Sequence, residues 1–321
     1  PFGRQVRDLR VSVTDRCNLR CRYCMTAEGM TWLPRAELLT FTEIERVARV
    51  CVERFGFDGI RLTGGEPTVR AGLPTLVQKL SGLGVDLALT TNGATFRLLA
   101  GELRRAGLRR VNISCDSLRA DRYASVTRRD VLPQVIDGVD AAVAAGLEPV
   151  KVNCVLIRGF NDDEVVEFAT FGRERGVTVR FIEFMPLDAS GDWAPDKVVP
   201  GDEVVAAIDA VYPLAPVDGS GAEPASRYRY VDGAGEIGVI ASVTHKFCGS
   251  CDRVRLTAEG MFRSCLFAVR EADLRSVLRG GGSDDDLAAA IIAEVGNKWS
   301  GHRIGQVDFV RPARTMSQIG G

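Results

Sequence analysis

The sequence has no long hydrophobic run and almost no net charge. Its 321 residues include 41 lysines and arginines against 42 aspartates and glutamates, a net charge of −1, which argues against the broad basic surface of a nucleic-acid-binding protein. No apolar stretch could span a bilayer, and the first ten residues lack the apolar segment of a secretion signal. We therefore expect a cytoplasmic protein that binds neither nucleic acid nor membrane. The chain begins with Pro1, so the native protein is expected to carry further N-terminal residues.

Disulfides are excluded as a main source of stability. Nine cysteines is an odd number, and a chain of this length can bury a large core without covalent cross-links. Six of them fall into two tight clusters, one near each end of the chain, which favours metal binding over disulfides. The other three, Cys51, Cys115 and Cys154, stand singly in apolar stretches and are expected to be small buried core residues.

Short β-rich runs alternate with amphipathic stretches through about the first 190 residues. Six strands are expected, at residues 9–14, 59–63, 86–90, 109–115, 149–157 and 177–185. Helices are expected between them at residues 42–55, 73–83, 95–106, 131–145 and 162–175, the first behind a Thr-x-x-Glu opening and each followed by a glycine. This α/β pattern predicts a parallel sheet with right-handed crossovers, either doubly wound or a barrel two units short of closure.

The pattern changes after Pro186. A short helix at residues 202–211 and a Gly/Ser/Pro-rich linker at 218–225 precede strand-like pieces at 228–231 and 237–243. The second group of cysteines, a helical stretch at about 285–295 and a polar tail follow. We predict two domains, a partial barrel over residues 1–186 and a C-terminal α+β extension over residues 187–321 that caps the barrel mouth, where the carboxyl ends of the strands gather functional residues.

Three cysteines, Cys17, Cys21 and Cys24, follow the first expected strand with the spacing Cys-x₃-Cys-x₂-Cys. A [4Fe–4S] cluster held entirely by protein takes four thiolates, so three in one loop leave one iron open to a ligand. A structural zinc site would need a fourth ligand nearby, but residues 15–25 contain no histidine and no fourth cysteine. The spacing therefore favours a cluster with an open iron.

This triplet, with the aromatic Tyr23 before its last cysteine, resembles the signature of the radical S-adenosylmethionine superfamily. The sequence Gly64-Gly65-Glu66-Pro67, directly after the second expected strand, is similar to the glycine-rich motif of that superfamily, where glycines let the backbone approach a ligand. The resemblance implies a partial (β/α)₆ TIM-type barrel. It also implies that S-adenosylmethionine chelates the open iron and, on reduction, yields a 5′-deoxyadenosyl radical.

A second set of three cysteines, Cys248, Cys251 and Cys265, lies near the C-terminus. His245 precedes the first of them by three residues, so the four side chains could form a closed tetrahedral zinc site. Three thiolates alone would instead suit a second cluster with an open iron. The residues themselves leave both interpretations open.

Two arginines, Arg253 and Arg255, occupy alternate positions of an expected strand beside this second set. Alternate guanidinium groups next to a metal site suit a polyphosphate, because each is permanently charged and can form two parallel hydrogen bonds. A solvated strand face is the alternative interpretation.

Motifs along essentially the whole chain resemble those of the GTP 3′,8-cyclase family, or molybdenum cofactor biosynthesis protein A family. They are residues 15–25, 62–67, 91–93, 114–117 and 180–186, the second cysteine set and the terminal Gly-Gly. The resemblance implies conversion of GTP to 3′,8-cyclo-7,8-dihydro-GTP, the first step of molybdenum cofactor (molybdopterin) biosynthesis. It also implies a radical lyase of the carbon–carbon class.

The resemblance assigns roles residue by residue. It implies that the first triplet holds one [4Fe–4S] cluster and that the second triplet holds another. The second cluster is then expected to bind the purine of GTP, so that His245 is a neighbour of the site and not a metal ligand. S-Adenosylmethionine contacts are implied at Tyr23, Gly65, Ser114 and Met185. GTP contacts are implied at Arg10, Arg61, Thr90, Lys151, Arg180, Arg253 and Arg255. Catalytic roles are implied for Arg253, Arg255 and the tail residues Gly320 and Gly321, whose thin backbone is expected to insert into the active site.

The same resemblance implies partners. They are GTP as substrate, an external one-electron reductant and, as consumer of the product, cyclic pyranopterin monophosphate synthase; a homodimer is left open. Two other functions also stay open. One is a peptide-modifying radical enzyme with auxiliary clusters, although such extensions usually carry more cysteines, and the other is a nucleotide or metal sensor with structural zinc.

Overall fold

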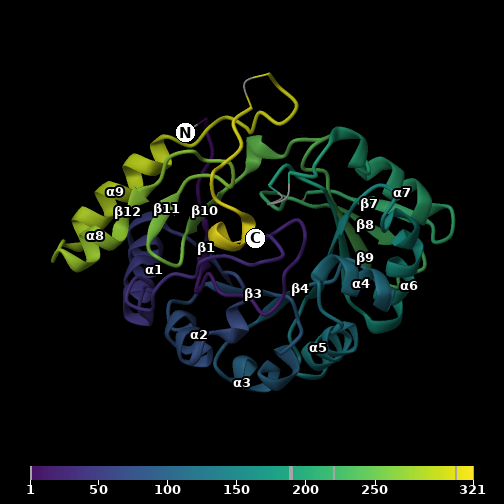
Figure 1. Ribbon diagram of the computed structural model, residues 1–321, viewed down its shortest axis with the longest axis horizontal. Coiled ribbons are helices and arrows are strands. Elements are labelled where there is room, and N and C mark those ends of the chain that lie inside the picture. The colour runs from purple at the N-terminus through teal and green to yellow at the C-terminus, as the bar shows by residue number, and fades with distance from the viewer. Residues whose placement is uncertain (1, 188–190, 220, 308, 321) are drawn as a thin grey trace.

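The computed structural model describes residues 2–187, 191–219, 221–307 and 309–320, and its centre is one twelve-stranded sheet. The strand order is β12-β11-β10-β1-β2-β3-β4-β5-β6-β9-β8-β7. The sheet curves into a ring with helices on its outside, and the C-terminal helix reaches the middle of the ring (Figure 1). The strands are β1 (Asp8–Ser12), β2 (Gly59–Thr63), β3 (Asp86–Thr91), β4 (Arg110–Ser114), β5 (Val150–Leu156), β6 (Thr178–Glu183), β7 (Leu214–Val217), β8 (Ser226–Tyr230), β9 (Glu236–Ile240), β10 (Arg253–Leu256), β11 (Met261–Arg263) and β12 (Ala272–Asp273).

Eight neighbouring strands, β10, β1 to β6 and β9, run parallel, and an antiparallel pair extends each end of the sheet. No ladder joins β7 to β12 among the described residues, so the fold is a partial TIM-type barrel, as predicted. In the described parts of the chain, no helix is long and apolar enough to cross a membrane. The helices are α1 (Phe41–Phe55), α2 (Leu73–Ser81), α3 (Ala100–Arg105), α4 (Ala120–Thr127), α5 (Leu132–Ala144), α6 (Val165–Arg175), α7 (Gly201–Asp209), α8 (Leu274–Arg279), α9 (Asp284–Gly296) and α10 (Met316–Ile319).

Local sequence and core packing agree in α1. The Glu43 N–H donates to the Thr40 hydroxyl at 3.2 Å, and the Thr40 N–H donates to the Glu43 carboxylate at 2.7 Å, which is the capping box expected from Thr-x-x-Glu. The helix ends at Gly56 in the left-handed conformation, with φ of 68°. Between these ends, Ile44 and Val47 are fully buried in the hydrophobic core between helices and sheet.

The three isolated cysteines behave as the sequence predicts. Cys51, Cys115 and Cys154 are all buried within the main hydrophobic core. Burial raises the pKa of the Cys115 thiol, which donates to the Ser117 carbonyl at 3.3 Å. These thiols therefore serve packing.

The six strands predicted for the first half are all present, and their ends agree within two residues. The helix predicted at 95–106 is interrupted by a short 3₁₀ turn before α3. Helix α4 was not predicted from the sequence, and its eight residues bury only Tyr123, Val126 and Thr127. A helix this short shows too few periodic apolar positions to be recognised.

The C-terminal region does more than cap the barrel. Strand β10 pairs parallel with β1, and β9 pairs parallel with β6, so the region after Pro186 supplies both outer strands of the parallel sheet. Periodicity shows that a strand forms but not which distant strand it pairs with. The domain division at residues 186 and 187 stays a prediction.

Candidate active site

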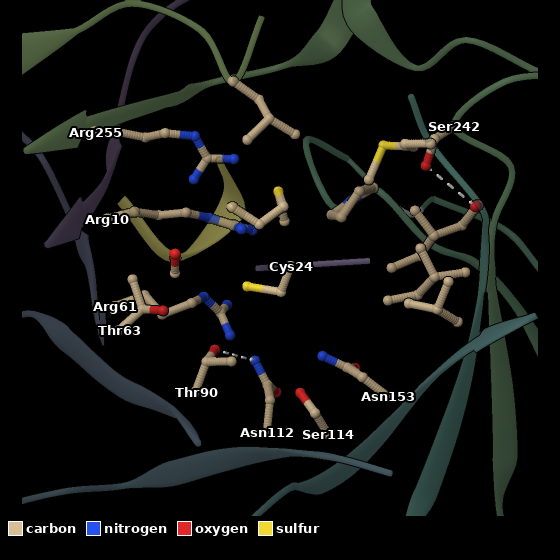
Figure 2. A pocket seen from close by; sticks show the side chains of 18 of the residues that line it. Arg10, Cys24, Arg61, Thr63, Thr90, Asn112, Ser114, Asn153, Ser242 and Arg255 are labelled. Atoms are coloured by element: carbon tan, nitrogen blue, oxygen red, sulfur yellow. Dashed lines mark hydrogen bonds between the residues drawn. The ribbon is translucent and has the colours of Figure 1, made fainter. Parts of the chain in front are cut away.

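The inner side of the barrel encloses a cavity of about 290 Å³, and both cysteine triplets line it. Figure 2 shows the guanidinium groups of Arg10, Arg61 and Arg255 pointing into this cavity from neighbouring strands, with Cys24 close by. Polar side chains of β3, β4 and β5, including Thr90 and Asn153, line another side of it. The cavity thus combines soft thiol ligands with permanent positive charge.

The first triplet lies on the loop that follows β1. The Cys17 sulfur accepts hydrogen bonds from the Leu19 N–H at 3.4 Å and from the Asn92 side-chain amide at 3.8 Å. The Cys24 N–H donates to the Cys21 carbonyl at 2.9 Å, so a tight turn brings the last two cysteines together. All three thiols face the cavity from one loop.

Burial dominates the titration of this triplet. It raises the pKa of Cys17 to about 11 and that of Cys24 to about 12, and it holds the pKa of Cys21 well above its ordinary value. Ser317 of the C-terminal helix hydrogen-bonds to Cys24 and opposes this shift. Such thiols become thiolates when a metal centre supplies the compensating positive charge.

The glycine motif packs against the cysteine loop. A Cβ on Gly64 would lie 2.5 Å from the Thr14 carbonyl oxygen, and one on Gly65 would lie 2.3 Å from the Arg16 carbonyl oxygen. The Gly65 N–H donates to the Thr14 carbonyl and the Glu66 N–H to the Arg16 carbonyl, both at 2.7 Å. The predicted close backbone approach is therefore present, and its partner is the cysteine loop, although both glycines also line the cavity.

The second triplet is assembled by the β10–β11 hairpin. Cys251 lies two residues before β10 and Cys265 two residues after β11, and the antiparallel pairing brings the two together at one end. Burial raises the pKa of Cys248. At Cys251 burial acts in the same direction, but the cations Arg253 and Lys298 outweigh it and lower the pKa to about 7.

The closed zinc site considered above is not assembled. His245 does not line the cavity, and its Nδ1 lies 3.4 Å from the Thr244 hydroxyl at an exposed position. Across the described residues, no three His, Cys, Asp or Glu side chains converge closely enough to hold a single metal ion. A four-iron cluster separates its thiolates more widely than one ion does, so three thiols around a cavity fit a cluster with an open iron.

Strand register places three arginines side by side. Arg10 lies opposite Arg255 of β10 and opposite Arg61 of β2. The buried Nε atoms of Arg10, Arg61 and Arg253 find no hydrogen-bond partner among the described residues. Burial, with repulsion between the guanidinium groups, lowers the pKa of Arg10 to about 9. Because bound anionic oxygens would both pair these groups and offset their repulsion, the cluster of arginines fits a polyanion.

Two other predicted GTP contacts are already partly neutralised. Lys151 donates to the Glu223 carboxylate at 2.7 Å and does not line the cavity. Arg180 lines the cavity, donates to the Asn153 side-chain oxygen at 3.0 Å, and lies 3.9 Å from the same Glu223 oxygen. Glu223 belongs to the stretch 218–225, which sequence analysis treated only as a linker.

The residues predicted to contact S-adenosylmethionine, namely Tyr23, Gly65, Ser114 and Met185, all line the cavity, as does Thr90. The Tyr23 hydroxyl donates to the Asp116 carboxylate at 2.6 Å, and burial raises the pKa of Asp116 to about 6. The four residues predicted to contact S-adenosylmethionine thus line one cavity, as a shared site requires, and their individual roles stay predictions.

The C-terminal tail reaches into the barrel. The Gly320 carbonyl accepts a hydrogen bond from Arg255 at 3.0 Å. Gly320 has φ of 75°, and a Cβ on it would lie 2.6 Å from both Ser12 Oγ and Thr63 Cγ2. Gly321 lies outside the described residues. A residue larger than glycine does not fit at position 320, and the catalytic role of the tail stays a prediction.

Several cavity residues were not predicted from the sequence. Asn112 and Asn153 stand two residues after Arg110 and Lys151 on their strands, and this alternation of polar residues could have identified them as members of one polar face. The Asn112 amide donates to Thr90 at 3.3 Å. Lys298 and His302 also line the cavity, but nothing in the local sequence distinguishes them from residues of a surface loop.

Comparison with known families agrees with this geometry. The radical SAM superfamily model matches residues 11–172, and the molybdenum cofactor synthesis C model matches residues 177–304. The solved structure of Streptococcus suis SuiB bound to S-adenosylmethionine aligns with a TM-score of 0.61 at 13% identity, over 89% of this chain and 68% of SuiB. At that identity the similarity shows the fold alone.

Relatives of higher identity cover the whole chain. The GTP 3′,8-cyclase of Mycolicibacterium smegmatis is 47% identical over 327 residues, covering 100% of this chain and 91% of the relative. The GTP 3′,8-cyclase of Pelotomaculum thermopropionicum is 48% identical over 324 residues, covering 100% of this chain and 99% of the relative. The chain therefore belongs to the GTP 3′,8-cyclase family of the radical S-adenosylmethionine superfamily.

Proposed function

We propose that this chain converts GTP to 3′,8-cyclo-7,8-dihydro-GTP, as a radical S-adenosylmethionine lyase of the carbon–carbon class that begins molybdenum cofactor biosynthesis. The observation that carries the proposal is a single cavity lined by two separate thiol triplets and by Arg10, Arg61, Arg253 and Arg255, which stand on β1, β2 and β10. A cavity for a small apolar substrate would gain nothing from guanidinium groups gathered at this cost of burial and mutual repulsion.

The two triplets are proposed to hold different [4Fe–4S] clusters. Cys17, Cys21 and Cys24 would hold the cluster that binds S-adenosylmethionine, and the second triplet would hold the cluster that binds the guanine base. When bound, the first cluster and S-adenosylmethionine supply a carbon radical that takes the hydrogen atom from C3′ of the GTP ribose. Tyr23, Gly65, Ser114 and Met185 are proposed to position S-adenosylmethionine for that step.

The arginines are proposed to hold the triphosphate. Arg10, Arg61 and Arg255 form one layer across three parallel strands, and each guanidinium can bind two phosphate oxygens. Arg253, beside Cys251 at 3.3 Å, would contact substrate close to the second cluster. Lys151 and Arg180 would join them once Glu223 moves away.

Fixed geometry is the main contribution of the chain itself. Holding the base at one end and the triphosphate on the arginines would keep C8 of guanine close to C3′, and proximity of this kind lowers the barrier to ring closure. Gly320, with its carbonyl bound by Arg255, would close the cavity around the substrate. Enclosure keeps water and other hydrogen donors away from a reactive carbon centre.

The proposal includes partners and location. An external one-electron reductant supplies the electrons, and cyclic pyranopterin monophosphate synthase takes the product. We propose that the enzyme acts in the cytoplasm, and a homodimer is compatible with the proposal.

The decisive experiment uses GTP carrying deuterium at C3′. The anaerobically reconstituted chain, reduced in the presence of S-adenosylmethionine, is expected to consume GTP and to form 5′-deoxyadenosine with one deuterium. The cyclised nucleotide should have lost the C3′ deuterium but otherwise have the composition of GTP, so chromatography and NMR are used to identify its new ring.

Two outcomes would point elsewhere. Deoxyadenosine without deuterium, and with GTP unchanged, would favour a peptide-modifying radical enzyme. Zinc with no iron in anaerobically purified protein would favour a sensor with a structural metal site.

A further inference from the structure

Lys298 places a buried ammonium beside the second triplet. The residue follows α9 and is 3% exposed. Its Nζ donates to the Arg253 carbonyl at 2.8 Å and to the Ser264 carbonyl at 2.7 Å, and it lies 3.7 Å from the Cys251 sulfur. Ser264 directly precedes Cys265, so one ammonium ties together the two segments that carry Cys251 and Cys265.

Among the described residues, the Lys298 ammonium has no carboxylate partner, since no Asp or Glu oxygen there lies within 4.0 Å of its Nζ. The Glu294 carboxylate instead accepts hydrogen bonds from the Ser264 N–H at 3.2 Å and from the Ser264 hydroxyl at 2.8 Å. A buried cation is costly unless a negative group compensates it.

The groups beside Lys298 that could supply negative charge are cysteine sulfurs. The Cys251 sulfur lies 3.7 Å from its Nζ, and Cys265 directly follows Ser264, whose carbonyl accepts from the same Nζ at 2.7 Å. Two neutral carbonyl oxygens supply hydrogen bonds but no net charge. The site therefore requires negative charge at the cysteines for its electrostatics to balance.

Neighbouring residues hold the third cysteine. The His302 backbone hydrogen-bonds to the Cys248 thiol, while the His302 ring lies 2.7 Å from the Ser242 carbonyl. A Cβ on Gly301 would lie 3.3 Å from the Cβ of Cys248. The short segment 298–302 thus contacts or approaches all three cysteine positions. Within this segment, Lys298 is the residue that places a charged group close to a sulfur.

We propose that Lys298 is a positioning residue of the second triplet: its ammonium is the fixed counter-cation of Cys251 and Cys265 when they hold an iron–sulfur cluster, and it raises the reduction potential of that cluster. The inference rests on the proposed function in one respect, the assignment of a cluster to this triplet. Reduction adds negative charge, so a neighbouring cation favours the reduced state, and hydrogen bonds and net charge around the sulfurs set cluster potentials.

The test isolates the second cluster. The whole chain with Cys17, Cys21 and Cys24 changed to alanine serves as the parent, is reconstituted anaerobically, and is titrated with reductant while electron paramagnetic resonance follows the remaining cluster. In the parent background, Lys298→Met is expected to lower the equilibrium constant for one-electron reduction about tenfold, which corresponds to about 59 mV. Lys298→Arg, which keeps the charge, is expected to stay close to the parent.

A matched control removes a lysine elsewhere. Lys79 on α2 pairs with Glu45 at 2.6 Å near the surface, and Lys79→Met is expected to leave the potential unchanged. Circular dichroism and iron content check that each variant folds and loads its cluster.

Each possible outcome either supports the proposed role of Lys298 or overturns it. A loaded Lys298→Met cluster with the parent potential overturns the inference. A folded Lys298→Met chain that binds no iron, while Lys298→Arg does, supports a required counter-cation. Equal loss of iron in both variants overturns it in favour of a packing role. A parent that binds no iron at all removes the second cluster itself, and that result contradicts the proposed function separately from Lys298.

Discussion

At the scale of single residues, the cavity is defined by positive charge that the chain compensates only in part. Arg10 and Arg61 have buried Nε atoms with no hydrogen-bond partner among the described residues, and Arg10 lies 4.0 Å from the Asp8 carboxylate. By contrast, Lys151 has Glu223 at 2.7 Å. Substitutions at the first group should therefore affect an anionic ligand, whereas substitution of Lys151 also releases Glu223 and mixes two effects.

Arg255 tests triphosphate binding together with the anchoring of the tail, because it also donates to the Gly320 carbonyl at 3.0 Å. Arg255→Met is expected to raise the KM for GTP about 10- to 100-fold, because a hydrogen bond to a charged group contributes about 1.5–3 kcal/mol. Steady-state kinetics on anaerobic enzyme measures the change, with iron content expected to equal that of the wild type. The exposed Arg229 of β8 serves as control, and Arg229→Met should leave KM unchanged. An unaltered KM in Arg255→Met would contradict the assignment.

Adding a single carbon atom at Gly320 tests whether the position of the tail matters for turnover. Gly320→Ala places a Cβ against Ser12 and Thr63 at 2.6 Å, so it should displace the tail and reduce GTP turnover by an order of magnitude or more, with both clusters intact. Gly305→Ala is a matched control, because Gly305 has a similar φ of 79° with nothing within 4 Å of its Cβ position. Gly305→Ala therefore has the same strain of a positive φ as Gly320→Ala, but its Cβ contacts no neighbouring atom.

Deleting the last two glycines extends this test. The truncated chain is expected to lose turnover while its iron content and visible spectrum match those of the intact chain. Wild-type turnover after truncation would show that the tail has no part in catalysis.

At the scale of elements, the packing of helices against the sheet determines at which positions a larger side chain fits. Helix α5 approaches the loop after β3 so closely that a Cβ on Gly138 would lie 2.6 Å from the Gly93 carbonyl oxygen. In α3, the nearest atom to a Cβ on Gly101 is the flexible end of Arg105 at 3.4 Å. Two glycines in helices thus have opposite environments.

These two glycines make a paired stability prediction. Gly138→Ala is expected to lower the free energy of unfolding by about 1–3 kcal/mol, because overpacking against a fixed backbone costs that much. Gly101→Ala is expected to raise it by about 0.5 kcal/mol, because alanine is the better helix former. Denaturant midpoints on the same preparation measure both, and equal shifts would contradict the packing described for α5.

At the scale of the whole molecule, two distant stretches of sequence meet across one cavity. The loop after β1 brings three thiols, and the segment before β10 together with the end of β11 brings the other three. Because β1 and β10 are parallel, the first triplet lies beyond the carboxyl end of these strands and the second beyond their amino end, and both line the cavity between. The two sets use separate loops, so each cluster should load without the other.

Iron content tests this independence. The intact chain is expected to bind about eight irons, and either triple cysteine-to-alanine variant about four, since each cluster contains four. Cys51→Ala, at a core cysteine, is the matched control and should keep about eight. Loss of all iron in the variant without Cys248, Cys251 and Cys265, while the other triple variant keeps about four, would mean that the first cluster depends on the second.

The sequence by itself determined the chemistry of this protein. Ligand spacing is local, so the triplet at Cys17, Cys21 and Cys24 was visible without a fold, and periodicity is local too, so the strands of the first half were predicted within two residues. Tertiary structure alone decided that β9 and β10 complete the parallel sheet and that Glu223 binds Lys151. It also decided that Lys298 faces the second triplet. These contacts join residues 47 to 245 positions apart, and only packing, which no local pattern encodes, selects them.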